Sequence, residues 1–158
     1  MKMETNKETK ELVEKFGVFL EKAVNFQPVS ARIAGYLLIS EPPYKTFDEI
    51  REYLNVSKSA VSQALNLLVS QNFLDYMTLH GDRKRYFKIT ANPWLNIIKK
   101  DFECMLQFKP LFQEILKQRS DKYPELNNQL KTMISFLEIF EKEIPLIFKK
   151  YKIALVSD

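Results

Sequence analysis

Glycine, cysteine and histidine are scarce in this chain of 158 residues, and each scarcity excludes a class of chemistry. The three glycines, Gly17, Gly35 and Gly81, leave no room for a Gly-rich phosphate-binding loop, which argues against nucleotide chemistry. The single cysteine, Cys104, excludes an internal disulfide, and the single histidine, His80, does not complete a metal cluster with it. We therefore expect no cofactor, no metal and a reducing compartment.

Long apolar runs are also missing from the sequence. No segment approaches the roughly eighteen apolar residues that a membrane-spanning helix needs. Residues 1–15 alternate lysine and glutamate and lack the apolar core of a signal peptide. Hydrophobic residues make up 46% of the chain and charged residues 28%, which is the balance of a globular protein with a core. We expect a folded cytoplasmic protein without a membrane partner.

The first part of the sequence has the apolar spacing of successive helices. Steps of three and four residues predict helices over 4–25, 29–40, 47–54 and 58–71. The third helix begins at Thr46, which forms a capping-box pattern with Glu49, and the fourth begins after Ser57, a good N-cap. Residues 41–45 contain two prolines and are predicted to form a loop.

The spacing changes after Asn72, a residue that tolerates the left-handed end of a helix. Residues 73–79 and 84–90 are rich in aromatic and β-branched residues and flank a turn with Gly81, which predicts a β-hairpin. The remaining sequence predicts a long helix that starts at 92–93 and a final helix from about residue 124. Prolines at two later positions are expected to kink or break these helices: Pro110 and Pro145.

Together these elements predict a fold that is mainly α with a small β-hairpin wing. The order helix, helix, tight turn, helix, hairpin over residues 28–91 is that of a winged helix-turn-helix. The flanking segments, 1–27 and 92–158, are predicted to be helical dimerisation regions. Apolar helix faces after the wing support this role, because a single winged helix has little surface with which to cover them.

The fourth predicted helix has an apolar back and a small, polar front. Such a front suits a DNA major groove about 12 Å wide, where short or flexible donors meet the edges of bases. We expect Gln63 and Asn66 to read bases, while the amino end of the helix directs its free amides at phosphate. The alternative is an ordinary solvated helix face.

The predicted wing concentrates positive charge. Between Lys58 and Lys88 the sequence has five cations and two anions, which accounts for three of the four excess positive charges of the chain. A basic hairpin can follow a minor groove or its phosphates, although a run of cations can also be a solvated turn. The predicted contacts with double-stranded DNA are Thr46, Ser57, Lys58, Ser59, Ser62, Gln63, Asn66, Arg83, Lys84 and Arg85.

Several segments resemble the GbsR-type branch of the MarR-like regulators. They are residues 31–38, 47–50, 57–62 and 81–86, within a resemblance that covers about residues 28–90. The chain departs from the branch at Ser59, where glycine is frequent, and at Asn72-Phe73, which replaces a glycine-led entry to the wing. The resemblance implies a homodimer that binds operator DNA, with dimer contacts from the terminal helices. The two-fold symmetry of such a dimer would select a near-palindromic site.

Other functions fit the sequence less well. A winged helix can also dock on a protein or an RNA, but a small, cationic front lacks the apolar anchors of a protein dock. An enzyme would need a nucleophile with its base, a metal set or paired carboxylates, and none is located. Cys104 is expected to be a small core residue, and His80 is expected to be structural or solvated. The aromatic stretches 102–112 and 136–148 are typical of helix core, with an effector pocket as the alternative.

Overall fold

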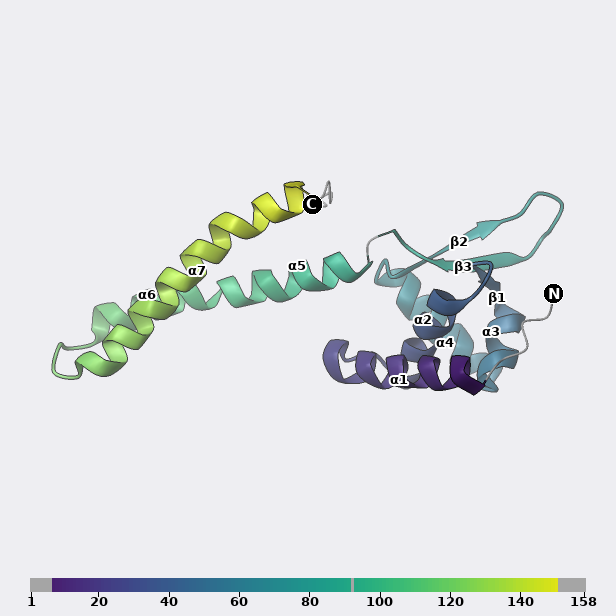
Figure 1. The fold of residues 1–158 in the computed structure, drawn as a ribbon, viewed down its shortest axis with the longest axis horizontal. Helices are drawn as coiled ribbons and strands as arrows, with labels where there is room; N and C mark the ends of the chain where they lie inside the picture. Colours follow the sequence, from purple (N-terminus) through teal and green to yellow (C-terminus); the bar gives the residue numbers. More distant parts are fainter. Residues whose placement is uncertain (1–6, 92, 151–158) are drawn as a thin grey trace. The chain divides into compact units, whose positions relative to one another are not determined.

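The structure, a computed structural model, describes residues 7–91 and 93–150, and its contacts divide it into two compact units, Met1–Pro93 and Trp94–Asp158 (Figure 1). The helices of the first unit are α1 (Lys7–Val24), α2 (Pro28–Ile39), α3 (Phe47–Leu54) and α4 (Lys58–Ser70). Its strands are β1 (Lys45–Thr46), β2 (Leu74–Thr78) and β3 (Arg85–Ile89). The second unit is formed by α5 (Pro93–Leu106), α6 (Phe108–Gln118) and α7 (Pro124–Lys150).

The predicted elements agree with the observed ones to within a few residues. α3 has its predicted bounds, and each strand of the hairpin is one residue shorter at either end than expected. α2 begins one residue early, at Pro28, because the fixed φ of proline suits the first turn of a helix. The mainly helical fold with a small antiparallel sheet is therefore confirmed. The start of the first predicted helix, residues 4–6, lies outside the described residues.

The sheet contains one strand that the sequence analysis missed. β2 and β3 form the predicted antiparallel hairpin, and β1 pairs with the other edge of β3, opposite Tyr86 and Phe87. β1 lies at the end of a segment predicted to be a loop. A two-residue strand next to two prolines carries no detectable alternation, so its pairing depends on the tertiary fold.

The core of the first unit is formed by aliphatic side chains from every one of its helices. Among its most completely buried members are Leu20, Ile33, Leu37, Ile50, Leu68 and Leu74. Each such side chain contributes about 1.5–3 kcal/mol by leaving water. α1 and α2 pack closely because Gly35 has no side chain, and a Cβ built there would lie 3.3 Å from the carbonyl oxygen of Val13.

Polar contacts fix the turn between α6 and α7 in the second unit. The Arg119 Nε donates to Asn127 Oδ1 at 2.7 Å, and the Asn127 Nδ2 donates to the carbonyl of Ser120 at 3.0 Å. Lys109 on α6 forms an ion pair with Glu141 on α7. These contacts join α6 and the segment after it to α7.

The two helix-interrupting prolines have different outcomes. The predicted break occurs between Leu106 and Phe108, so Pro110 falls in the first turn of α6. Backbone amides of a first turn have no partner within the helix, so the missing N–H of proline costs no hydrogen bond there. α7 continues through Pro145, and the kink expected there stays a prediction. Residues 151–158 of the predicted dimerisation region lie outside the described residues.

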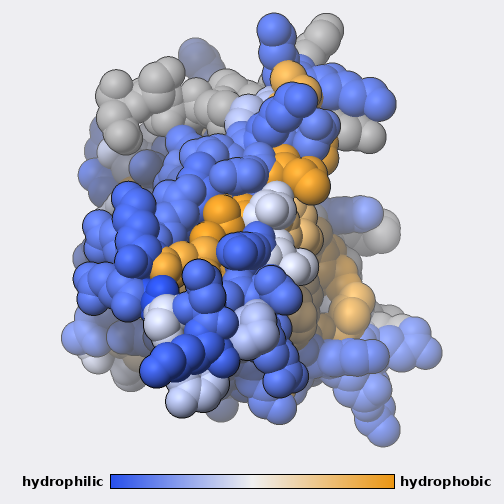
Figure 2. Space-filling view, turned by 90° about the vertical axis from the view of Figure 1, so that its left-hand side faces the viewer, coloured by the Kyte–Doolittle hydropathy of each residue, from blue (hydrophilic) through white to orange (hydrophobic). Residues whose placement is uncertain are grey.

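The second unit exposes many large apolar side chains. In Figure 2 hydrophobic residues form a band with hydrophilic residues on both sides. The exposed apolar residues of α5 to α7 include Ile98, Phe108, Leu111, Ile115, Leu126, Met133, Phe136, Ile139, Leu146 and Ile147. Among the described residues, no helix has the length and apolar character needed to cross a membrane.

Candidate nucleic-acid interface

The amino end of α4 is defined by a short turn and a serine cap. Asn55 adopts the left-handed conformation with a φ of 51°, which ends α3 and reverses the chain. The Ser57 hydroxyl then accepts a hydrogen bond from the amide of Ala60 at 3.2 Å. This cap satisfies one of the free amides of the first turn and leaves the others available to an anion.

α4 separates its two faces as the sequence predicted. Val61, Ala64, Leu65 and Leu68 are buried in the core. The exposed residues of this helix and its cap include all the predicted contacts from this segment: Ser57, Lys58, Ser59, Ser62, Gln63 and Asn66. A polar front is therefore available along most of the helix.

A groove connects this front with the base of the wing. It has a volume of about 370 Å³ and lies between the start of α3, α4 and β3. Its apolar lining comes from Phe47, Leu65 and Phe87. The polar residues that line it are Thr46, Asp48, Ser62, Asn66, Lys84 and Arg85. The fold thus brings together residues of α4 and of the wing that are about twenty positions apart in the sequence.

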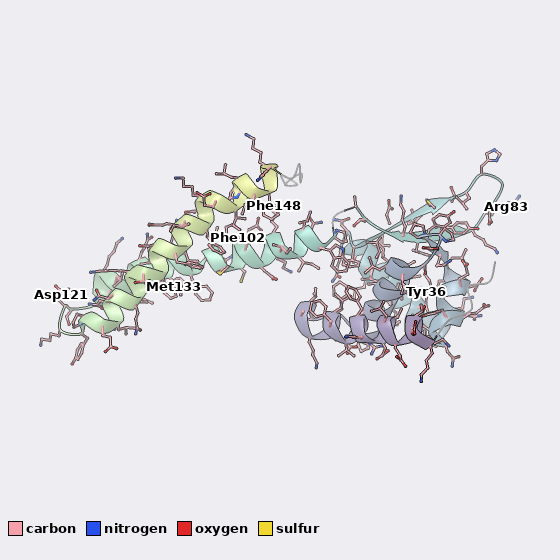
Figure 3. The ribbon with its side chains drawn as sticks, viewed as in Figure 1. Tyr36, Arg83, Phe102, Asp121, Met133 and Phe148 are labelled. Atoms are coloured by element: carbon pink, nitrogen blue, oxygen red, sulfur yellow. The ribbon has the colours of Figure 1, made fainter. Side chains whose placement is uncertain are left out.

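A second hollow continues the first along the amino end of α4. It is lined by Phe47, Ser57, Lys58, Ser59 and Ser62, and it shares Phe47 and Ser62 with the groove. We call the two hollows together the α4–wing groove. Eight of the ten predicted contacts line it. Gln63 is exposed beside the groove, and Arg83 lies at the far end of the hairpin (Figure 3).

Thr46 lies in the groove but its side chain is already engaged. The residue is only 8% exposed. Its hydroxyl accepts from the Glu49 amide at 3.3 Å, and its backbone amide donates to Glu49 Oε2 at 2.8 Å, which completes the predicted capping box. The hydroxyl also donates to Glu49 Oε2, at 2.7 Å. Thr46 therefore orients α3 at the groove wall, and its direct contact with DNA stays a prediction.

The tip of the wing is organised by a carboxylate. Asp82 accepts from the Tyr86 hydroxyl at 2.6 Å and from the Lys84 amide at 2.9 Å, while Gly81 supplies the φ of 82° that the turn requires. The Tyr86 hydroxyl, followed by the Lys84 amide, lowers the pKa of Asp82. The ring of Tyr44 packs edge-on against that of Tyr86, with centroids 5.6 Å apart. Sequence reasoning missed both tyrosines, because a cross-strand partner shows in a sequence only once the register is known.

The cations of this surface are not neutralised by neighbouring acids. Among the described residues, no carboxylate lies within 4.0 Å of the charged nitrogens of Lys58, Arg83, Lys84 or Arg85. Arg85 instead places its guanidinium over the ring of Tyr76. The groove therefore combines small hydrogen-bonding side chains and one acid, Asp48, with cations that form no ion pair among the described residues. Cations and small donors of this kind suit a phosphate backbone and base edges.

The two residues considered for other chemistry lie at the surface. His80 is exposed in the hairpin turn. Cys104 is exposed on α5, so the expectation that it packs in a core is wrong for this unit. The partly buried faces of α5 carry Phe102 and Met105 instead.

A three-helix core with a helix-turn-helix and a basic hairpin defines a winged-helix protein. Residues 24–85 match the MarR family. The HTH-type transcriptional regulator MmpR5 of Mycobacterium tuberculosis is 23% identical over 134 residues, which cover 85% of this chain and 81% of that protein. A solved structure of a transcriptional regulator has the same fold with a TM-score of 0.59 at 22% identity, and the match covers 92% of this chain and 98% of that one. Residues 24–85 of this chain are therefore similar to the MarR family, and the solved structure shows that the fold is shared.

Proposed function

We propose that the protein is a sequence-specific transcriptional regulator that binds a near-palindromic DNA operator as a homodimer. The observation that carries this proposal is the α4–wing groove, where the polar front of one helix and the cations of the hairpin face a common surface. A protein dock would need exposed apolar anchors there, whereas the large apolar residues of this groove are buried or half-buried: Phe47, Leu65 and Phe87.

The geometry supports a division of labour among the groove residues. α4 enters the major groove with Gln63 and Asn66 toward the bases, since both are exposed and carry amides that pair well with base edges. The capped amino end of α4 meets a phosphate. Arg83 at the tip of the hairpin and Lys84 beside it contact the minor groove or its phosphates, where they fix the register of the protein.

The homodimer is supported by apolar surface that a single chain leaves uncovered. α6 alone exposes Phe108, Leu111 and Ile115, and the α1–α2 face exposes Leu12 and Leu38 beside an apolar hollow of about 230 Å³. A second copy of the chain would cover such patches. A two-fold axis would also set two α4 helices about 34 Å apart, one turn of DNA, and so select a near-palindromic site.

The finer assignments belong to the same proposal. The segments 31–38 and 81–86 support membership of the GbsR-type branch. We assign residues 28–91 to DNA binding and residues 1–27 and 92–158 to dimerisation, although α1 packs on α2 within the first compact unit. A regulator of this kind has no catalytic step, and the groove contains no residue to which we assign one.

Selection of bound sequences from random duplex DNA tests this function directly. We expect enrichment of a near-palindrome, with an affinity that falls steeply as salt rises because bound cations release counterions from the phosphates. Absence of binding to any duplex at the lowest salt would contradict the proposal. Binding of single-stranded RNA with equal affinity would favour a different winged-helix role.

A further inference from the structure

We propose that Tyr76 is a positioning residue for DNA binding, which holds the guanidinium of Arg85 in the α4–wing groove. The inference rests on the proposed function, because it assigns a role within the same interface. Nothing in the sequence marks Tyr76 as functional, since it occupies an ordinary position of the hairpin. The structure assigns its role through the register of the two strands.

The register places Tyr76 and Arg85 on one face of the hairpin. Tyr76 lies opposite Phe87, and Arg85 lies opposite Thr78, so Tyr76 and Arg85 are diagonal neighbours across the strands. Long and aromatic side chains reach each other across such a diagonal. The Cζ atom of Arg85 lies 4.9 Å from the centroid of the Tyr76 ring, within the range of a cation–π contact.

This contact restrains a side chain that has no other anchor among the described residues. Arg85 is exposed, and no carboxylate of the described chain lies within 4.0 Å of its guanidinium. A free arginine loses considerable rotational entropy when it is immobilised at an interface. A guanidinium that already rests on a ring loses less, so the stack favours the bound conformation before DNA arrives.

The stack also leaves the binding capacity of Arg85 intact. The ring contact occupies none of the N–H donors of Arg85 in a conventional hydrogen bond, so these donors stay available to a ligand. Arg85 lines the groove together with Ser62, Asn66 and Lys84. Its donors are therefore held beside the polar front of α4, where a phosphate of the duplex would pass.

The exposure of Tyr76 agrees with this role. The residue is 46% exposed, so its ring is not a full part of the hydrophobic core. Replacing it should change the stability of the fold little, which allows its effect on DNA binding to be measured in a folded protein. Tyr76→Phe keeps the aromatic face and removes only the hydroxyl. Tyr76→Thr keeps a residue that suits a strand and removes the ring.

A double-mutant cycle on the full chain tests the proposal. Affinity for the selected operator is measured for wild type, Tyr76→Phe, Tyr76→Thr, Arg85→Ala and the Tyr76→Thr/Arg85→Ala pair. We expect Tyr76→Phe to bind like wild type and Tyr76→Thr to bind about two- to five-fold more weakly, the value of an exposed cation–π contact. In the Arg85→Ala background, Tyr76→Thr should have no further effect.

Four outcomes would overturn the inference. An equal loss from Tyr76→Thr with and without Arg85 would mean that the ring acts on DNA itself, and a loss in Tyr76→Phe would transfer the role to the hydroxyl. NMR of the free protein gives a test without DNA: the side-chain protons of Arg85 should be shifted upfield in wild type and Tyr76→Phe and not in Tyr76→Thr. Absence of that shift refutes the stack and leaves the DNA function standing, whereas a wild type that binds no duplex refutes both.

Discussion

At the tip of the wing, one carboxylate determines the backbone of the turn that carries three cations. Asp82 is bonded to the Tyr86 hydroxyl and the Lys84 amide rather than to a charged side chain. Its negative charge therefore organises the turn without occupying the cations. In the sequence, Asp82 counts only as a negative charge that opposes the cations of the wing. In the structure, its carboxylate also holds the backbone of the turn.

Removing the phenol of Tyr86 tests this use. Tyr86→Phe should loosen the turn, because Asp82 loses the hydrogen bond from the phenol. The amide of Lys84 should then exchange its hydrogen faster, and affinity for all duplexes should fall a few-fold. Hydrogen exchange and operator titration measure the two effects. Unchanged exchange at the wing would contradict the assignment.

The same contact predicts how the wing responds to pH. The pKa of Asp82 is lowered, so its bonds favour the folded wing fully above the ordinary value of 3.8 and lose this effect as the pH falls through the lowered value. The order of the wing should therefore be constant from about pH 5 to 8 and decline only in strong acid. NMR titration of the Lys84 amide measures this response, and its chemical shift should stay constant from about pH 5 to 8. A transition near neutrality would contradict the assignment.

Base reading and phosphate contact should be separable by mutation. Gln63→Ala or Asn66→Ala should relax the preference among operator variants at a cost of about 1 to 3 kcal/mol, because each amide pairs with particular base edges. Arg83→Ala or Lys84→Ala should weaken all duplexes about equally and flatten the salt dependence. Ser70→Ala, at the opposite end of α4, serves as a control. Four unchanged affinities would show that α4 and the wing do not form the interface.

At the scale of elements, α1 and α2 are joined by one arginine. The guanidinium of Arg32 pairs with Glu14 and Glu21 of α1 and donates to the carbonyl of Pro28 at 2.9 Å. The hydrogen bond from Arg32 lowers the pKa of Glu14. One side chain thus links two helices that the sequence analysis placed in different domains.

Arg32→Ala should lower the free energy of unfolding by about 1 to 2 kcal/mol, because most of the Arg32 side chain is removed from solvent. The Glu14 side chain is mostly in solvent, so its ion pair with Arg32 accounts for the smaller part of this loss. The contribution of Glu14 is present above its ordinary pKa of 4.5 and is lost as the pH falls through the lowered value. Urea unfolding of variant and wild type should therefore differ at pH 7 and converge in acid. A difference that grows in acid would refute the role of Glu14.

Sequence reasoning predicted the features that depend on local interactions and missed those that depend on contacts between residues far apart in the sequence. Caps and apolar spacing are local, so the bounds of α3 and the polar front of α4 were predictable from Thr46, Ser57 and the buried positions between them. β1, the Tyr76–Arg85 stack and the Tyr86–Asp82 bond depend on which residues the sheet brings opposite one another. No local pattern specifies such pairs, which is why the groove residues were predicted and the residues that position them were not.

At the scale of the whole molecule, the two compact units have different surfaces. The first has a core drawn from four helices and a sheet, whereas the second leaves large apolar residues of α6 and α7 in solvent. A chain that ends near Thr90 should consequently be monomeric and lose most of its operator affinity, because linking two half-sites raises the effective concentration of the second. Sedimentation and operator titration measure these two properties.

The full chain offers a sharper test of the dimer through one exposed side chain. Leu111 on α6 is 55% exposed, so a charge at this position is tolerated by a monomer but is costly inside an apolar interface. Leu111→Glu should therefore shift the protein toward monomers and weaken operator binding, while its thermal unfolding at low concentration changes little. Gln118→Glu, at an exposed polar position of the same helix, adds the same charge and should leave the dimer intact. Light scattering that finds the wild-type protein monomeric at micromolar concentration would refute the homodimer and leave the apolar faces of α6 and α7 to another partner.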